Sequence, residues 1–291
     1  MKSLFQGTAV AIVTPFIEGG VDYIAFEKLI EREIVQGVKA IVVLGTTGES
    51  ATVSEKERER LIKIAKKKIG GRVKLIVGTG SNNFEKAYSF TLMAKRLGAD
   101  GVLVVTPYYN KTTQRGVKEY YQSLGKIGIP MIVYNVPSRT GLMIELSTIK
   151  DLIYSCDMIY GIKESTSDVS RIISLAKICS GRIALYSGED GLNYIFYCLG
   201  ANGCISVSAN VCPQKVQNVY EYMQKGDYRA ALREQCKLDA INEAMFLETN
   251  PIPVKYALSK LGLIQNELRL PLVSISPKNA KKVDKILKNK N

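Results

Sequence analysis

Lys163 is the residue of this sequence whose type and position most clearly allow chemistry. It lies in the stretch IYGIKEST (159–166), after an apolar run that should form a buried parallel strand. A lysine at a strand end is usually a surface residue whose ammonium reaches water. If this strand ends at the mouth of a barrel, however, loss of water favours the neutral amine, which can attack a carbonyl carbon and form a Schiff base. That position makes Lys163 a candidate covalent nucleophile.

Proton transfer at this amine must use a side chain other than histidine, because the chain contains none. Histidine is also the commonest metal ligand, and the six cysteines form no C-x-x-C pair. We therefore expect neither a metal nor a cofactor. A tyrosine such as Tyr134 is the best candidate to carry protons to and from a carbinolamine on Lys163.

The elements that would position these residues are short β-branched runs, each followed by a longer amphipathic stretch. Two of the helical stretches cover 22–37 and 54–70, and the second opens on Ser54 with Glu57 three residues later, the pattern of a capping box. Eight strands are expected, at 8–13, 40–45, 73–78, 101–106, 130–135, 158–163, 183–188 and 203–208.

This alternation predicts parallel strands with helical crossovers, buried on both faces. Eight such units favour an α/β fold of the (β/α)8 TIM-barrel type, and an open doubly wound sheet is the alternative. After Val211 the strand signals stop, and helices with a break at Gly226–Asp227 follow. We expect a catalytic barrel over 1–224 and a C-terminal helical domain over 225–291.

The formal charge of +13 invites a nucleic-acid interpretation. Much of the excess lies in 63–74 and 276–291, where lysines are interspersed with apolar residues at helical spacing and without interleaved aromatic residues. This pattern favours solvated helix faces, so nucleic-acid binding is only a remote alternative. No apolar run reaches membrane-spanning length or forms a signal-peptide core, and the cysteines lie in apolar surroundings. We expect a cytoplasmic protein with buried, reduced thiols.

Other unusual residues also fall where predicted strands end, the catalytic face of a TIM barrel. GTTGES (45–50) could be only a tight turn, and TPYYN (106–110) a proline turn with packed tyrosines. GTGSNN (78–83) has Asn83 where a dinucleotide fingerprint needs its third glycine. In YNVPSRTG (134–141), Arg139 beside two hydroxyl residues suits a carboxylate ligand.

GTTGES, TPYYN, YNVPSRTG, GIKES and NPIPVK together closely resemble the pyruvate-dependent class I aldolase and lyase family that includes N-acetylneuraminate lyase. The resemblance runs from about Gly7 to the region after Lys255. It implies that Lys163 forms an imine with pyruvate and that Tyr134 exchanges protons beside it. It also implies a relay in which Thr47 links Tyr134 to Tyr109, and in which Tyr109 comes from a neighbouring subunit.

The same resemblance implies how substrates are held. Thr46 and Thr47 would bind the pyruvate carboxylate, and Gly188 and the backbone of Ile205 would line the pocket. Arg139 would bind the carboxylate of L-aspartate 4-semialdehyde. An arginine in that loop favours the branch of the family that uses this amino-acid aldehyde in lysine and diaminopimelate biosynthesis. Aldolases that cleave N-acetylneuraminate or a 2-keto-3-deoxy sugar acid are the alternative.

Two further expectations follow from the family pattern. The protein should be a homo-oligomer, a tetramer built as a dimer of dimers. Lysine-inhibited relatives bind L-lysine at the dimer interface, where Ser50, Ala51, Asn82 and Tyr108 match their site. This chain carries Lys86 and Arg58 where those relatives carry an acid and a histidine or glutamate. Two cations facing a cationic ligand predict weak or absent inhibition by lysine.

Overall fold

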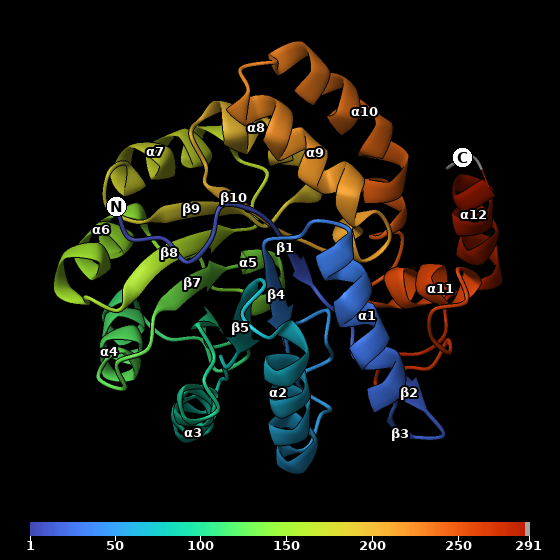
Figure 1. Cartoon of the computed structure of the whole chain (residues 1–291). Coiled ribbons are helices and arrows are strands. Elements are labelled where there is room, and N and C mark those ends of the chain that lie inside the picture. Colours follow the sequence, from blue (N-terminus) through green and yellow to red (C-terminus); the bar gives the residue numbers. More distant parts are fainter. Residues whose placement is uncertain (289–291) are drawn as a thin grey trace.

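The computed structural model describes residues 1–288, and eight parallel strands form a closed barrel at its centre (Figure 1). The strands of the barrel are β1 (Gly7–Ala11), β4 (Ala40–Val43), β5 (Lys74–Gly78), β6 (Gly101–Val105), β7 (Met131–Asn135), β8 (Ile159–Glu164), β9 (Ala184–Ser187) and β10 (Gly203–Ser206). The first strand of the barrel, β1, pairs with the last, β10, and with the second barrel strand, β4. The TIM-barrel prediction is therefore confirmed.

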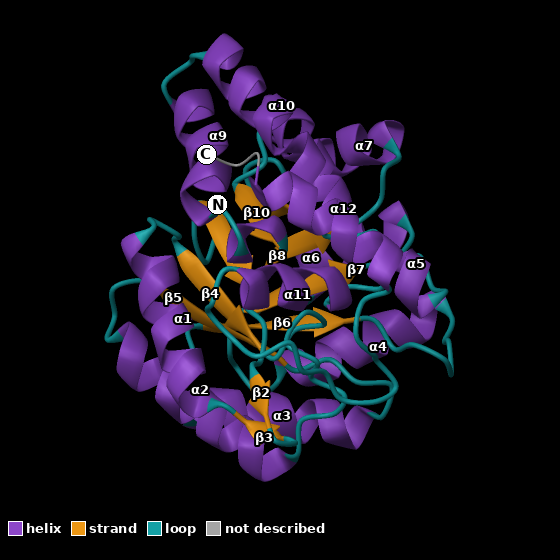
Figure 2. Cartoon of the chain, turned by 90° about the vertical axis from the view of Figure 1, so that its right-hand side faces the viewer, coloured by secondary structure: helices purple, strands orange, loops and turns teal. Residues whose placement is uncertain are grey.

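Helices surround this barrel, as the view turned by 90° shows (Figure 2). Helices after the strands include two short ones, and two single turns of 3-10 helix follow β9 and β10. The helices are α1 (Tyr23–Val35), α2 (Glu55–Ile69), α3 (Phe84–Arg96), α4 (Gln114–Gly125), α5 (Pro137–Thr140), α6 (Leu146–Ser155), α7 (Val169–Cys179), η1 (Asp190–Leu192), α8 (Asn193–Cys198), η2 (Ser208–Asn210), α9 (Pro213–Gln224), α10 (Tyr228–Ala244), α11 (Ile252–Lys260) and α12 (Pro277–Lys288).

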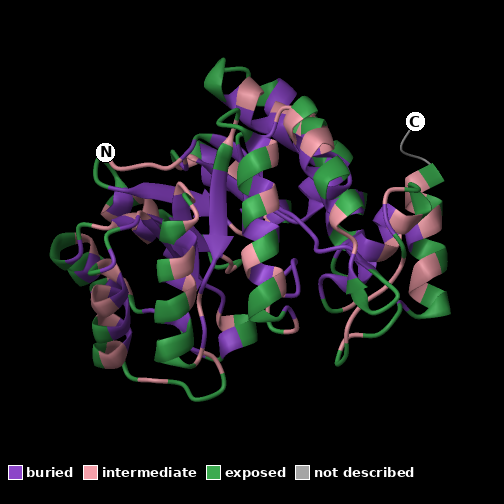
Figure 3. Cartoon of the chain, turned by 60° about the horizontal axis from the view of Figure 1, so that its bottom comes forward, coloured by how far each residue is buried: buried purple, intermediate pink, exposed green. Residues whose placement is uncertain are grey.

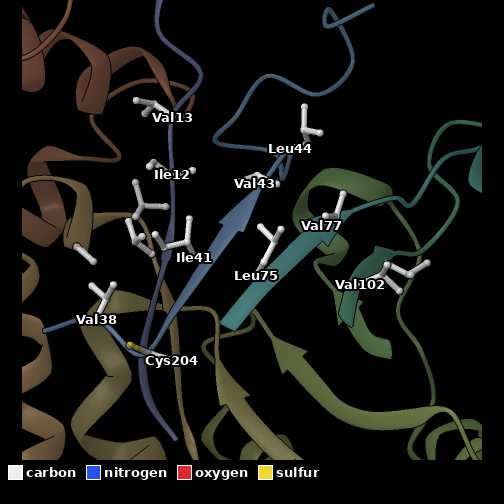
Figure 4. Packing of buried hydrophobic residues seen from close by; sticks show 14 of the residues in the cluster. Ile12, Val13, Val38, Ile41, Val43, Leu44, Leu75, Val77, Val102 and Cys204 are labelled. Carbon is white, nitrogen blue, oxygen red and sulfur yellow. The ribbon is translucent and has the colours of Figure 1, made fainter. Parts of the chain in front are cut away.

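Alternate residues of each strand face opposite sides, which divides the core into two clusters. Ile41 and Val43 of β4 and Leu75 of β5 point outward to the helices (Figure 4). Ala40 and Val42 belong instead to a smaller cluster inside the barrel. The near-continuous apolar strands of the sequence follow from burial on both faces.

The capping box predicted at α2 is present. Ser54 Oγ accepts from the backbone N–H of Glu57, and the Glu57 carboxylate accepts from the N–H of Ser54. The sequence did not predict the hairpin of β2 (Phe16–Ile17) and β3 (Gly20–Val21), an antiparallel pair outside the barrel. Strands of two residues are too short for an alternating pattern to show.

The C-terminal helices α10, α11 and α12 gather at one side of the barrel (Figure 1). The predicted break at Gly226–Asp227 separates α9 from α10, and Asp227 caps the second helix. Buried residues of α10 and α11, such as Leu238 and Leu258, belong to the same apolar cluster as the barrel helices. Viewed by burial, the helices turn buried faces inward and exposed faces to solvent (Figure 3).

Most of each basic tract lies on a helix, α2 for the first and α12 for the second, and residues 289–291 of the second lie outside the described part. Lys68 and Arg72, in the first tract, form ion pairs with Glu31 of α1. All six cysteines are free, but Cys198 and Cys236 are exposed, so the prediction of buried thiols is wrong for these two. Both lie on amphipathic helices, where one face meets solvent. Within residues 1–288, no helix combines the length and the apolar character needed to cross a bilayer.

Candidate active site

Lys163 lies at the carboxyl end of β8 and points into a cavity of about 420 Å³ at the mouth of the barrel. Its side chain is 5% exposed. Ala11, Val42 and Leu103 supply an apolar part of the cavity wall. The fold therefore places the amine as predicted, at the end of a buried strand and facing a cavity.

Glu164, the next residue, faces the other side of the strand and anchors it. Its fully buried carboxylate accepts from Asn135 Nδ2 at 2.8 Å and from Arg171 Nε at 3.1 Å. Burial raises the pKa of Glu164, although Arg171 and Asn135 both favour the ionised form. Because these bonds hold the backbone of β8, they fix the direction in which Lys163 projects. No pattern in the sequence indicates these roles of Glu164 and Arg171.

Tyr134 is paired with Lys163 in the register of β7 and β8, so both side chains enter the barrel mouth. The Nζ atom of Lys163 lies 4.3 Å from the centroid of the Tyr134 ring. Tyr134 is 7% exposed and also lines the cavity. The structure thus brings together the amine and the phenol that were predicted to work as a pair.

Gly188 approaches Lys163 from the loop after β9. A Cβ atom at this position would lie 2.7 Å from Lys163 Cε and 2.0 Å from Ser165 Oγ. Glycine is therefore required for the lysine side chain to extend past the loop. The adjoining Glu189 also lines the cavity. Burial raises the pKa of Glu189, and Asp190 adds to this while Lys163 opposes it.

Thr46 and Thr47 reach the cavity from the loop after β4. That loop is held by a buried ion pair, in which Lys255 of α11 donates to Glu49 Oε1 at 2.6 Å. Lys255 also donates to the carbonyl of Thr14, and burial lowers its pKa. Lys255, the lysine of the NPIPVK motif, thus stabilises the GTTGES loop through its ion pair with Glu49.

Arg139 enters the cavity from α5, and Asn250 lies beside it at the start of the segment that leads to α11. Arg139 Nη2 donates to the backbone carbonyl of Asn250 at 3.1 Å. Asn250 Nδ2 donates to Thr47 Oγ1 at 3.0 Å. Asn250 belongs to the NPIPVK motif, but nothing in the sequence around it indicates that it reaches this site.

Two predicted site residues do not line this cavity. Tyr109 is 92% exposed, with a backbone φ of +70°, and its side chain lies outside the protomer's own site. Ile205 is buried among the apolar residues inside the barrel. Because Tyr109 does not reach the cavity of its own chain, its predicted role depends on a second subunit.

Three of the residues that resemble a lysine-binding site line a different cavity, and Asn82 does not. Ser50, Ala51 and Tyr108 line a second, more apolar cavity of about 300 Å³, which shares Thr46, Arg139 and Asn250 with the first. Arg58 donates to the carbonyls of Gly78 and Ser50 at 3.0 and 3.1 Å, and burial lowers its pKa to about 10. Lys86 is exposed. Weak lysine inhibition stays a prediction.

The sequence profile of the dihydrodipicolinate synthetase family matches residues 4–290. The chain is 44% identical to the 4-hydroxy-tetrahydrodipicolinate synthase of Thermodesulfovibrio yellowstonii, over 98% of both chains. It is also 44% identical to that of Aquifex aeolicus, over 99% of this chain and 98% of the relative. The crystal structure of dihydrodipicolinate synthase from Aquifex aeolicus superposes with a TM-score of 0.96, over 98% of each chain. The Acinetobacter baumannii enzyme, crystallised with pyruvate, is 40% identical and has a TM-score of 0.96, covering 98% and 99% of the two chains.

Proposed function

Since this chain belongs to the dihydrodipicolinate synthetase family, we propose that Lys163 is the amine through which it condenses pyruvate with L-aspartate 4-semialdehyde. The chain is a lyase of lysine and diaminopimelate biosynthesis that acts as a 4-hydroxy-tetrahydrodipicolinate synthase. The observation that carries the proposal is the placement of the Lys163 amine. It is buried, faces the cavity and, among the described residues, has no carboxylate in an ion pair with it. Lys255, by contrast, is fully buried and locked to Glu49.

The reaction then follows from the order of bond changes. The neutral amine of Lys163 attacks the keto carbon of pyruvate, and the carbinolamine loses water to give an imine. Loss of a methyl proton gives an enamine, whose carbon attacks the aldehyde of the second substrate. The amino group of that substrate next attacks the imine carbon, closes the ring and releases Lys163. Tyr134, beside the amine, donates and accepts the protons of these steps.

The other residues of the cavity hold the substrates in this scheme. Thr46 and Thr47 bind the pyruvate carboxylate, and Arg139 binds the carboxylate of the semialdehyde through the fork of its guanidinium. Gly188 leaves room for the substrate next to Lys163 Cε, whereas Ile205 lies inside the barrel and does not line the pocket. Ala11, Val42 and Leu103 form an apolar part of the wall, which strengthens the polar contacts beside it.

We place the enzyme in the cytoplasm as a homo-oligomer, a tetramer of two dimers in which Tyr109 of each subunit completes its partner's site. Six free cysteines support a reducing compartment. The exposure of Tyr109 supports the role of a partner subunit. A tyrosine that is 92% exposed has no ligand to act on in its own protomer.

Borohydride reduction with pyruvate, followed by peptide mass mapping, tests the role of Lys163. We expect the Lys163 peptide to gain the mass of pyruvic acid less one oxygen atom, while the Lys255 peptide of the same digest stays unmodified. The Lys163→Arg variant should give no adduct and no condensation product. An adduct on another lysine, with Lys163 unmodified, would refute the proposal.

Comparing aspartate semialdehyde with N-acetylneuraminate as substrates tests which branch of the family the chain belongs to.

A further inference from the structure

Asn250 connects two groups of the site that come from distant parts of the chain. It is 5% exposed and lies on the wall that the two cavities share. Its backbone carbonyl accepts from Arg139, and its side-chain Nδ2 donates to Thr47 Oγ1. Its Oδ1 atom is buried and has no hydrogen-bond partner among residues 1–288. One residue thus contacts both the arginine and the threonine of the proposed mechanism.

The direction of the bond to Thr47 has a chemical consequence. A hydroxyl has one proton to donate and two lone pairs that accept. Because Thr47 Oγ1 accepts from the Asn250 amide, its own proton stays free. Within the described residues Thr47 makes no other side-chain hydrogen bond, so that proton is available to an oxygen in the cavity, such as the Tyr134 phenol or a bound carboxylate.

We propose that Asn250 is a positioning residue that sets the direction of hydrogen bonding through Thr47, so that the Thr47 proton is kept for a group in the cavity. This inference rests on the proposed function. Asn250 itself does not touch the reacting atoms. It acts through Thr47, while its backbone carbonyl separately orients Arg139.

Two substitutions, one that keeps the shape of asparagine and one that truncates it, separate this role from simple packing. In Asn250→Asp, the ionised carboxylate has nothing to donate and accepts the Thr47 proton in a charge-assisted bond, which is stronger than a neutral one. That proton is then no longer available to a group in the cavity. In Asn250→Ala, the Thr47 hydroxyl loses a partner but can still turn its proton toward the cavity. A packing role predicts the opposite order, because the aspartate keeps the shape of asparagine and the alanine leaves a hole.

We expect kcat of N250D, measured at saturating concentrations of both substrates near pH 8, to be about tenfold below that of N250A. As the pH falls through the pKa of the new carboxyl group, that group gains a proton that it can donate to Thr47. The kcat of N250D relative to the parent should therefore rise toward low pH, whereas that of N250A should stay level. The KM for the semialdehyde should change little in N250A, since Arg139 bonds to the backbone of residue 250.

The Thr47→Val background supplies the control, because it removes the hydroxyl through which Asn250 acts. There, N250D and N250A should give equal kcat values and parallel pH profiles. Thermal unfolding of each variant reports whether it is folded at the assay temperature. The proposal is overturned if N250A is the slower variant, if the pH profiles of N250D and N250A are parallel with Thr47 present, or if the difference survives in the Thr47→Val background. Borohydride trapping on Lys163 in the parent stands apart from these outcomes and reports on the proposed function alone.

Discussion

Arg139 uses one guanidinium nitrogen to hold the backbone of Asn250 and forms no ion pair with a carboxylate among the described residues. Its remaining N–H groups are free to bind an anionic substrate in the cavity. We expect Arg139→Met to raise the KM for aspartate semialdehyde by roughly 10- to 100-fold, the worth of a charge-assisted hydrogen bond. The KM for pyruvate should change far less. Steady-state kinetics with each substrate varied in turn measures both values.

The Arg139→Lys variant is the matched control, since it keeps the positive charge but loses the planar fork. Its KM for the semialdehyde should lie between those of the parent and Arg139→Met. An equal rise in both KM values for Arg139→Met would contradict the assignment, because it would point to a general disturbance of the cavity.

Single residues differ in how far the sequence could predict them. Lys163 and Tyr134 lie at the ends of predicted strands and Arg139 follows one, and parallel strands deliver their carboxyl ends to one face. Asn250 follows a helix, and its partner Thr47 is 203 residues away in the sequence. Nothing local to Asn250 indicates that the chain brings these two residues together. The contacts that the C-terminal segment makes with the site therefore could not be predicted from the sequence and are known only from the structure.

Elements were predicted well where burial imposes a pattern on the sequence. The eight barrel strands are apolar on both faces, and the capping box at Ser54 is a local signal that α2 obeys. The segment 261–276 between α11 and α12 has no repeating pattern, yet it is tied to α2 by Arg269. Arg269 donates to both carboxylate oxygens of Glu57, at 2.9 and 2.6 Å.

This bidentate pair makes the attachment of the C-terminal segment sensitive to acid. The hydrogen bonds from Arg269 hold the pKa of Glu57 at about 2, below the 4.5 that is ordinary for a glutamate. The stabilisation is therefore complete above about pH 4.5 and is lost as the pH falls toward 2. We expect Glu57→Gln to lower the free energy of unfolding by roughly 1–3 kcal/mol at pH 7 and to flatten its decline between those pH values. Urea unfolding at a series of pH values measures this.

Glu31→Gln is the comparison variant. The pKa of Glu31 is also lowered to about 2, by hydrogen bonds from Arg72 and Lys68, but these side chains lie at the surface. Solvent and salt screen such a pair, so its loss should change stability less than the loss of the Glu57 pair. Equal effects of the two substitutions, or a pH-independent loss in Glu57→Gln, would show that Arg269 does not tie the segment to α2.

The whole molecule presents an apolar stripe that the single chain leaves uncovered. Phe84, Tyr88 and Leu92 of α3 are 37%, 39% and 48% exposed, and their spacing of four residues puts them on one face of the helix. Asn110 Nδ2 donates to the carbonyl of Asn82 and so ties the loop that carries Tyr109 to the start of α3. This bond places the loop of the exposed tyrosine next to the start of the helix that carries the stripe. Exposed apolar patches of this kind are surfaces that a partner subunit covers.

Placing a charge on this stripe tests the proposed assembly and the proposed role of Tyr109 together. We expect Leu92→Asp to shift the parent oligomer toward smaller species in analytical ultracentrifugation, because burying a lone carboxylate at an interface is costly. Ile24→Asp is the control: Ile24 is 71% exposed on α1, outside the stripe of α3, and its substitution should leave the assembly intact. If Tyr109 completes a partner's site, the dissociated Leu92→Asp protein should also lose condensation activity at low protein concentration and regain part of it on concentration. Small species that retain the parent kcat would contradict the relay through Tyr109, and an unchanged oligomer would remove this face as the interface.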